Sequence, residues 1–256
     1  MALGGATLSL GAFPSPLKIL EIFVAVYLIV SGMHSINDTI DFKRDEEKWP
    51  MRPLPSGLIS REELGIYGIA IGLAGVALSY IWFTWQCALF VALVLFLGFI
   101  YTKYTRDKIG YLTLIWIPAF LPVGAWAAFA PETLFTRLPW LLYLFMMTHQ
   151  IAHIASVELH APETKALVIG LEQKNEPALY VLSIILMSIV GIIIYLVASL
   201  HWIYLLVLLA LTIVSLLSAV PMIKDPNSME NLRKANMAIV NYNIFYWLAL
   251  AIGVVL

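Results

Sequence analysis

The chain has 256 residues, of which 61% are hydrophobic and 12% are charged, and its formal net charge is −1. A soluble domain usually carries about 25% charged residues, so this composition excludes an ordinary soluble enzyme. The weak net charge and the apolar content together exclude nucleic acid as a partner. The single cysteine, Cys87, excludes a scaffold held together by disulfides.

Long apolar runs recur along the chain, and each reaches or approaches the roughly 20 residues that a helix needs to cross a bilayer. Backbone amides in lipid must bond internally, so runs of this length form helices, whereas a barrel would need short alternating strands. The predicted spans are 17–37, 63–83, 85–102, 111–130, 138–155, 178–200, 202–221 and 237–256. The first dozen residues have the character of the end of a further helix. We expect an all-α, polytopic transmembrane bundle of about nine spans, the first truncated, forming a single domain over residues 1–256.

The charged residues are unevenly divided between the two sides of the predicted membrane. All lysines and arginines except Lys18 and Arg137 follow odd-numbered full spans, and the positive-inside rule places these loops in the cytoplasm. The acidic residues, apart from Glu21 and Glu132, lie on the same side. A surface rich in both signs suits an anionic substrate with a metal counter-ion, although short outer loops also leave little room for charge. The pattern predicts a multi-pass cell-membrane protein whose active site faces the cytoplasm.

The first full span ends in HSINDTIDFKRD, where Asn37, Asp41 and Asp45 are spaced four apart. In a helix they share one face, with Asp38 at its border and His34 one turn earlier. Carboxylates near a membrane need compensating cations, and a helix C-terminus disfavours them further. Mg²⁺ prefers oxygen ligands and commonly joins carboxylates to substrate phosphates. The pattern therefore predicts a magnesium site for a phosphate ester, and the alternative is a solvated helix terminus.

A proline-rich turn, KWPMRPLPSG, follows this helix end. Arg52 in the turn could return to the carboxylates or reach a phosphate. It could also be an arginine that extends its side chain to the membrane interface.

The segments NDTIDFKRD and RPLPSG together resemble the first signature of the UbiA-type membrane prenyltransferases, N-D-x-x-D-x-x-x-D followed by R-P-[L-P]-S-G, and every fixed position is present. YTKYTRDKIGYL is similar to the family's Tyr-Ser and lysine-containing turn after the fourth helix. The resemblance covers essentially the whole chain. It implies transfer of an isoprenoid chain from an isoprenyl diphosphate to a lipophilic acceptor within the membrane lipid, with Mg²⁺ as the cofactor.

The resemblance also implies roles for individual residues. Asn37, Asp38, Asp41 and Asp45 would hold magnesium and diphosphate. The candidate basic and polar contacts to substrate are His34, Arg44, Arg52, Lys103, Arg106, Lys108 and Lys165. Arginine and lysine both bind phosphate, although arginine can do so with two hydrogen bonds at once.

The chain departs from the family pattern at the second aspartate-rich segment, after the sixth helix. The matching region, THQIAHIASVELHAPETKALVIG, lacks the expected aspartates and offers His149, His153 and Glu158 instead. Three readings stay open. Glu158 and a histidine replace the second magnesium site; or the histidines act as a base or a positive anchor beside a single magnesium; or diphosphate chemistry has been lost. A packing pair of histidines is a further alternative.

Ionisation of an allylic diphosphate produces a carbocation, which aromatic faces stabilise within about 6 Å. Tyr143 and Tyr242 are candidates, although core packing is the commoner role of such residues. Asn241 is a candidate inward contact, because asparagine facing lipid is costly. Besides prenyl transfer, the sequence is compatible with a prenyl diphosphate cyclase or lyase on the same fold, and with an inactive membrane protein that binds lipid or a partner.

Overall fold

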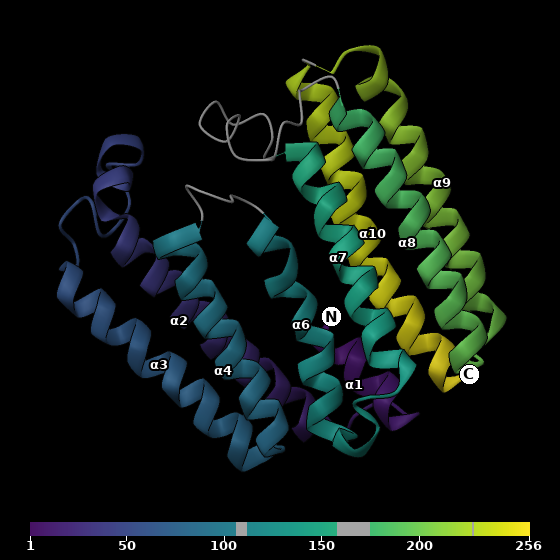
Figure 1. Ribbon diagram of the computed structural model, residues 1–256, viewed down its shortest axis with the longest axis horizontal. Coiled ribbons are helices and arrows are strands. Elements are labelled where there is room, and N and C mark those ends of the chain that lie inside the picture. Colours follow the sequence, from purple (N-terminus) through teal and green to yellow (C-terminus); the bar gives the residue numbers. More distant parts are fainter. Residues whose placement is uncertain (106–111, 158–174, 227) are drawn as a thin grey trace.

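The computed structural model describes residues 1–105, 112–157, 175–226 and 228–256. Within these ranges the chain is helical and contains no strands, which confirms the all-α prediction (Figure 1). The helices are α1 (Ala2–Leu10), α2 (Pro16–Lys48), α3 (Arg61–Trp82), α4 (Trp85–Ile100), the π-helix η1 (Tyr101–Thr105), α6 (Leu112–Phe129), the short 3₁₀-helix η2 (Pro131–Thr133), α7 (Arg137–Val157), α8 (Glu176–Ala198), α9 (Trp202–Lys224) and α10 (Met229–Val255).

Six segments in the described part of the chain are long and apolar enough to cross a membrane, namely α2, α3, α4 with η1, α8, α9 and α10. The apolar part of α6, Ile115–Phe129, is shorter, and α7 carries several polar side chains along its second half. Helix α1 has only nine residues, as the sequence predicts for a truncated first helix. The chain is therefore an integral membrane bundle.

Helix α2 is longer than the predicted span of residues 17–37, and its extension carries the aspartates. The helix begins with Pro16 after Ser15, whose hydroxyl accepts a hydrogen bond from the amide of Lys18, and it continues to Lys48. Asp41 and Asp45 therefore lie on the last turns of a regular helix.

Two groups of helices, α2–α4 and α7–α10, lie on opposite sides of α6 and α1 (Figure 1). Helices α2 and α3 approach closely because small residues face each other. A Cβ on Gly32 would lie 2.9 Å from the carbonyl oxygen of Gly68, and a Cβ on Gly68 would lie 2.9 Å from Cβ of Ser35. Contacts between small residues are a common way of packing membrane helices. This contact holds α2 against α3 directly before the aspartates.

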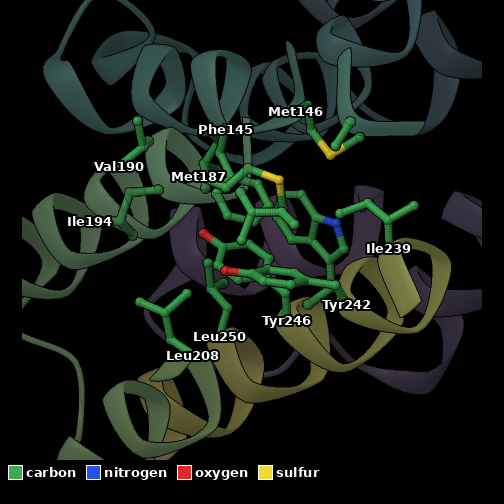
Figure 2. Close-up of a cluster of buried hydrophobic side chains, with 14 of the residues drawn as sticks. Phe145, Met146, Met187, Val190, Ile194, Leu208, Ile239, Tyr242, Tyr246 and Leu250 are labelled. Carbon is green, nitrogen blue, oxygen red and sulfur yellow. The ribbon is translucent and has the colours of Figure 1, made fainter. Parts of the chain in front are cut away.

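The larger hydrophobic core lies among α7, α8, α9 and α10, and aromatic rings dominate it (Figure 2). Phe145 stacks on Tyr246 with 3.6 Å between ring centroids, and Tyr242 packs beside both. The hydroxyl of Tyr204 donates to the carbonyl of Gly191 at 3.1 Å, which provides a polar partner inside the core. These buried contacts hold α7, α8, α9 and α10 together.

Candidate active site

The carboxylates of Asp41 and Asp45 are buried at the end of α2 and do not extend into water. The two residues are 3% and 2% exposed, whereas the side chain of Asp38 is 41% exposed. Burial of ionised carboxylates is costly unless charged partners compensate them. The solvated helix terminus that was the alternative for this pattern does not describe the two inner aspartates.

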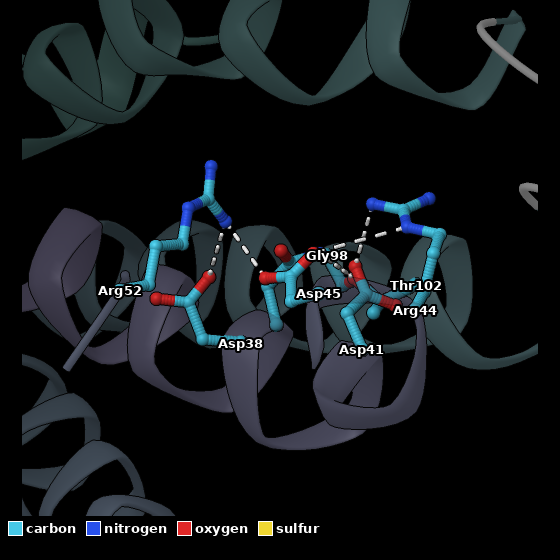
Figure 3. Close-up of polar contacts among 8 residues, drawn as sticks. Asp38, Asp41, Arg44, Asp45, Arg52, Gly98 and Thr102 are labelled. Atoms are coloured by element: carbon cyan, nitrogen blue, oxygen red, sulfur yellow. Dashed lines mark hydrogen bonds and ion pairs between the residues drawn. The ribbon is translucent and has the colours of Figure 1, made fainter. Parts of the chain in front are cut away.

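Two arginines compensate the buried carboxylates (Figure 3). Arg44 Nη2 lies 3.2 Å from Asp41 Oδ2. Arg52 Nη1 lies 2.7 Å from Asp45 Oδ2 and 3.8 Å from Asp38 Oδ1, and its guanidinium also lies over the ring of Trp49. The proline-rich turn therefore returns Arg52 to the carboxylates, one of the two outcomes expected for it.

Asn37, one turn before Asp41, is held from the neighbouring helix. Its Nδ2 donates to Oγ1 of Thr102 at 2.8 Å, and the Thr102 hydroxyl donates to the carbonyl of Gly98 at 3.0 Å. Thr102 lies on the π-helix that follows α4. The Asn37 amide therefore lies in a defined orientation on the same face of α2 as Asp41 and Asp45.

The oxygen-rich end of α2 has the donor set that Mg²⁺ prefers. Oδ1 of Asp45 is buried and accepts no hydrogen bond, although Arg44 Nε lies 4.0 Å away. Among the described residues, no three His, Cys, Asp or Glu side chains converge in a way that would hold a metal alone. Mg²⁺ usually takes one or two carboxylates and completes its shell with water and substrate phosphates. The residues present fit that mode of binding.

The histidine pair on α7 contacts α10. His149 is 3% exposed, and its Nε2 lies 3.2 Å from the carbonyl oxygen of Ile239. Asn236 lies beside His153, and its Oδ1 accepts a hydrogen bond from the Ser156 hydroxyl at 3.3 Å. The two imidazole rings are nearly parallel with centroids 6.4 Å apart. These contacts describe a polar seam between α7 and α10.

A model of the UbiA prenyltransferase family matches residues 1–251. The chain belongs to the UbiA prenyltransferase family. The fold agrees, because a solved structure from a study of digeranylgeranylglyceryl phosphate synthase in membranes superposes with a TM-score of 0.74 at 20% identity, covering 99% of this chain and 92% of that one. A UbiA homologue from Archaeoglobus fulgidus gives a TM-score of 0.63 at 15% identity, covering 98% of this chain and 92% of that one.

Curated relatives of this UbiA-family chain cover different shares of its length. A digeranylgeranylglyceryl phosphate synthase of Thermococcus sibiricus is 30% identical over 121 residues, which is 46% of this chain and 43% of that protein. Protoheme IX farnesyltransferase 1 of Picrophilus torridus is 26% identical over 213 residues, which is 79% of this chain and 71% of that protein. The chain thus matches less than half of the length of the first of these relatives.

Only some of the other residues predicted for this UbiA-family site lie within the described part of the chain. His34 is exposed on α2, one turn before Asp38. Lys103 lies over the rings of Phe99 and Tyr104, with its Nζ 5.4 and 5.3 Å from their centroids. Four of the predicted site residues lie outside the described residues: Arg106, Lys108, Glu158 and Lys165.

The predicted aromatic and amide contacts lie elsewhere in the UbiA fold. Tyr242 is fully buried in the α7–α10 core, and its hydroxyl lies 3.4 Å from Thr212 Oγ1. Tyr143 packs against Phe120, with 4.8 Å between ring centroids, and Asn241 is exposed on α10. The structure does not bring these three residues to the aspartates through any contact among the described residues.

Three polar residues near the expected sites were not predicted, namely Thr102, Ser156 and Asn236. Thr102 lies within the segment YTKYT, whose similarity to the family turn marked the region without marking the hydroxyl. Asn236 lies two turns into α10 and meets the histidine seam, whereas Asn241 is on the exposed side. A helical wheel of α10 would separate these faces only once the position of α7 was known.

Proposed function

We propose that this protein is a magnesium-dependent prenyltransferase that moves an isoprenyl chain from its diphosphate to a lipophilic acceptor within the membrane. The observation that carries the proposal is the buried pair Asp41 and Asp45, neutralised by two arginines at the end of a membrane helix. Membership of the UbiA family supports the same activity. We also propose that this end of the bundle faces the cytoplasm, as the positive-inside rule predicts.

The chain's own residues can bind and neutralise a diphosphate. When Asp41 and Asp45 take part in holding Mg²⁺, the guanidinium groups of Arg44 and Arg52 no longer need these carboxylates as partners and can bind diphosphate oxygens. Bound Mg²⁺ would supply positive charge to the leaving diphosphate. Asn37, Asp38, Asp41 and Asp45 would hold the ion. Each charged side chain would therefore keep an oppositely charged partner when substrate and metal replace the internal ion pairs.

An apolar cleft between α1, α2, α4 and α6 suits the isoprenyl chain. Its lining is almost entirely hydrocarbon, including Ile29, Val91 and Phe120, and its cavity volume of about 50 Å³ would have to widen to admit a prenyl chain. Ile29 lies on α2, about three turns before Asp41. A chain in this cleft would be shielded from water, which protects an allylic carbocation from hydrolysis.

For the acceptor, we propose a lipid with a phosphate headgroup. The name of the Thermococcus sibiricus relative, digeranylgeranylglyceryl phosphate synthase, favours a glyceryl phosphate compound. A hollow with a cavity volume of about 400 Å³ lies at the end of the α7–α10 seam, and its lining includes the polar residues Ser156, Arg233 and Asn236. Arg233 is exposed and supplies the positive charge that a phosphate requires.

The acceptor proposal is tested by neutralising Arg233. Arg233→Gln should raise the KM for a glyceryl phosphate acceptor about tenfold, with little effect on the KM for the isoprenyl diphosphate. Lys234→Gln is the matched control, because Lys234 is the next residue and already pairs with Glu230 at 2.6 Å. Equal effects of both variants would reject the assignment.

The enzyme itself is tested with purified protein in lipid nanodiscs. Isoprenyl diphosphates of several lengths are incubated with acceptor lipids and either Mg²⁺ or EDTA, and released diphosphate and prenylated lipid are both measured. Asp45→Asn should lower the Mg²⁺-dependent rate by about a hundredfold. Glu46→Gln, an exposed neighbour on the same helix, should leave it unchanged.

The products separate the remaining candidates. Release of diphosphate with a hydrocarbon or alcohol product and no acceptor adduct would identify a cyclase or lyase. No Mg²⁺-dependent release with any chain length would reject the enzymatic proposal and leave a lipid-binding or partner-binding protein.

A further inference from the structure

A short hydrogen-bonded chain connects the amide of Asn37 to helix α4. Nδ2 of Asn37 is 2.8 Å from Oγ1 of Thr102, and Oγ1 of Thr102 is 3.0 Å from the carbonyl oxygen of Gly98. Thr102 is 6% exposed, so water does not compete freely for its hydroxyl.

The donor hydrogens available to Asn37, Thr102 and Gly98 determine which way the Asn37 amide points. A threonine hydroxyl has one hydrogen to donate, and a backbone carbonyl can only accept. Because the Thr102 hydrogen is directed to Gly98, its oxygen must act as an acceptor towards Asn37. Only the NH₂ end of an amide can donate, so Nδ2 lies at Thr102 and Oδ1 points away from it.

We propose that Thr102 is a positioning residue, which fixes the Asn37 amide so that Oδ1 is presented as an oxygen ligand for a divalent cation beside Asp41 and Asp45. This inference rests on the proposed function, since it concerns the same metal. Without this hydrogen bond the amide could turn its NH₂ end towards the cation. NH₂ cannot coordinate Mg²⁺, which is why the orientation of the amide affects metal affinity.

The local backbone explains how α4 reaches this amide. A Cβ on Gly98 would lie 2.7 Å from Sδ of Met33, so the two helices pack closely one turn before the hydrogen bond. The π-helix then begins at Tyr101, and Thr102 is its second residue. π-Helical turns displace the residues that follow and occur frequently at functional sites. The close approach and the π turn together place Thr102 Oγ1 at the amide.

Mn²⁺ binding tests the inference without relying on turnover. Protein in nanodiscs is titrated with Mn²⁺, and bound ion is measured by electron paramagnetic resonance at a fixed concentration of a non-ionising prenyl thiolodiphosphate. Thr102→Val, which removes the hydroxyl at similar volume, should weaken Mn²⁺ binding about tenfold, as is typical when a residue that orients a ligand is lost. Thr102→Ser should restore wild-type affinity.

The decisive comparison uses Asn37→Asp as a second background. A carboxylate has oxygen at both ends, so its orientation no longer matters. Thr102→Val should therefore have little effect on Mn²⁺ affinity when Asp replaces Asn37. If the valine variant weakens binding equally in both backgrounds, Thr102 acts only by packing and the inference fails.

Two other outcomes would also overturn the inference. Wild-type affinity in Thr102→Val, with Asn37 unchanged, would show that the amide needs no fixing. Absence of Mn²⁺ binding to the wild-type protein would overturn the proposed function and this inference with it, and the two failures are thus distinguishable. Reaction of Cys87 with a thiol dye during heating confirms that each variant is folded, because this cysteine is buried.

Discussion

Replacing Gly68 by alanine should destabilise the protein, whereas the same change one turn later, at Gly72, should not. A Cβ on Gly68 would lie 2.9 Å from Cβ of Ser35 and 3.1 Å from the backbone nitrogen of Ile36. Neither atom can move without α2 itself. A Cβ on Gly72 would meet only Leu95, at 3.5 Å, which is ordinary contact.

The two variants share the gain in helix propensity from alanine and differ in the steric cost of the added methyl group. Alanine favours a helix over glycine by about 0.5–1 kcal/mol at either position. Forcing an extra methyl group into a packed contact costs about 1–3 kcal/mol. The shared contribution cancels in the difference, so Gly68→Ala should be about 1–3 kcal/mol less stable than Gly72→Ala. At roughly 2–4 °C per kcal/mol for a chain of this size, its apparent Tm should be lower by about 2–12 °C.

The protein carries a convenient reporter for this measurement. Cys87 is its single cysteine and is 6% exposed, so a thiol-reactive dye labels the protein only as it unfolds. Heating both variants and the wild type in the same detergent gives the difference in apparent Tm. Equal apparent Tm values for the two variants would refute the proposed close packing of α3 on the aspartate-bearing helix.

Other predictions concern the ion pairs, the seam and a helix start. Arg52→Ala should lose about 1–3 kcal/mol, because the half-exposed guanidinium is the 2.7 Å partner of the buried Asp45 carboxylate. The variant should gain more thermal stability from added Mg²⁺ than wild type does; equal gains would contradict competition between arginine and metal. His149→Leu should lose about 1 kcal/mol by removing the hydrogen bond between the imidazole and the Ile239 carbonyl; lost activity at full stability would instead indicate a chemical role. Ser60→Ala should cost about 1 kcal/mol by breaking the capping box with Glu63, measured by the same dye.

Sequence reasoning was most successful where the information was local. The four-residue spacing of Asn37, Asp41 and Asp45 placed them on one helical face, because helical periodicity follows from the backbone alone. The number and approximate limits of the helices followed from apolar runs, because lipid forces the backbone to bond internally. Arg52 could be expected near the carboxylates because it follows Asp45 by only seven positions.

Predictions that depended on packing between distant helices were less successful. Tyr242 and Asn241 are neighbours on α10, yet one is fully buried and the other exposed. Sequence alone does not say which face of α10 meets α7, so it could not single out Asn236 as the partner of His153. For the same reason the hydroxyl of Thr102, 65 positions away from Asn37, was not anticipated.

The arginine-neutralised carboxylates have a consequence for how this protein is made. A ribosome-bound chain must insert the end of α2 into the membrane before any substrate is present. Because Arg44 and Arg52 already balance Asp41 and Asp45, the newly synthesised protein can reach its mature shape without capturing an ion. With magnesium as the cofactor, as proposed above, its supply would govern turnover and leave biogenesis unaffected, so magnesium starvation would leave intact, idle protein in the bilayer.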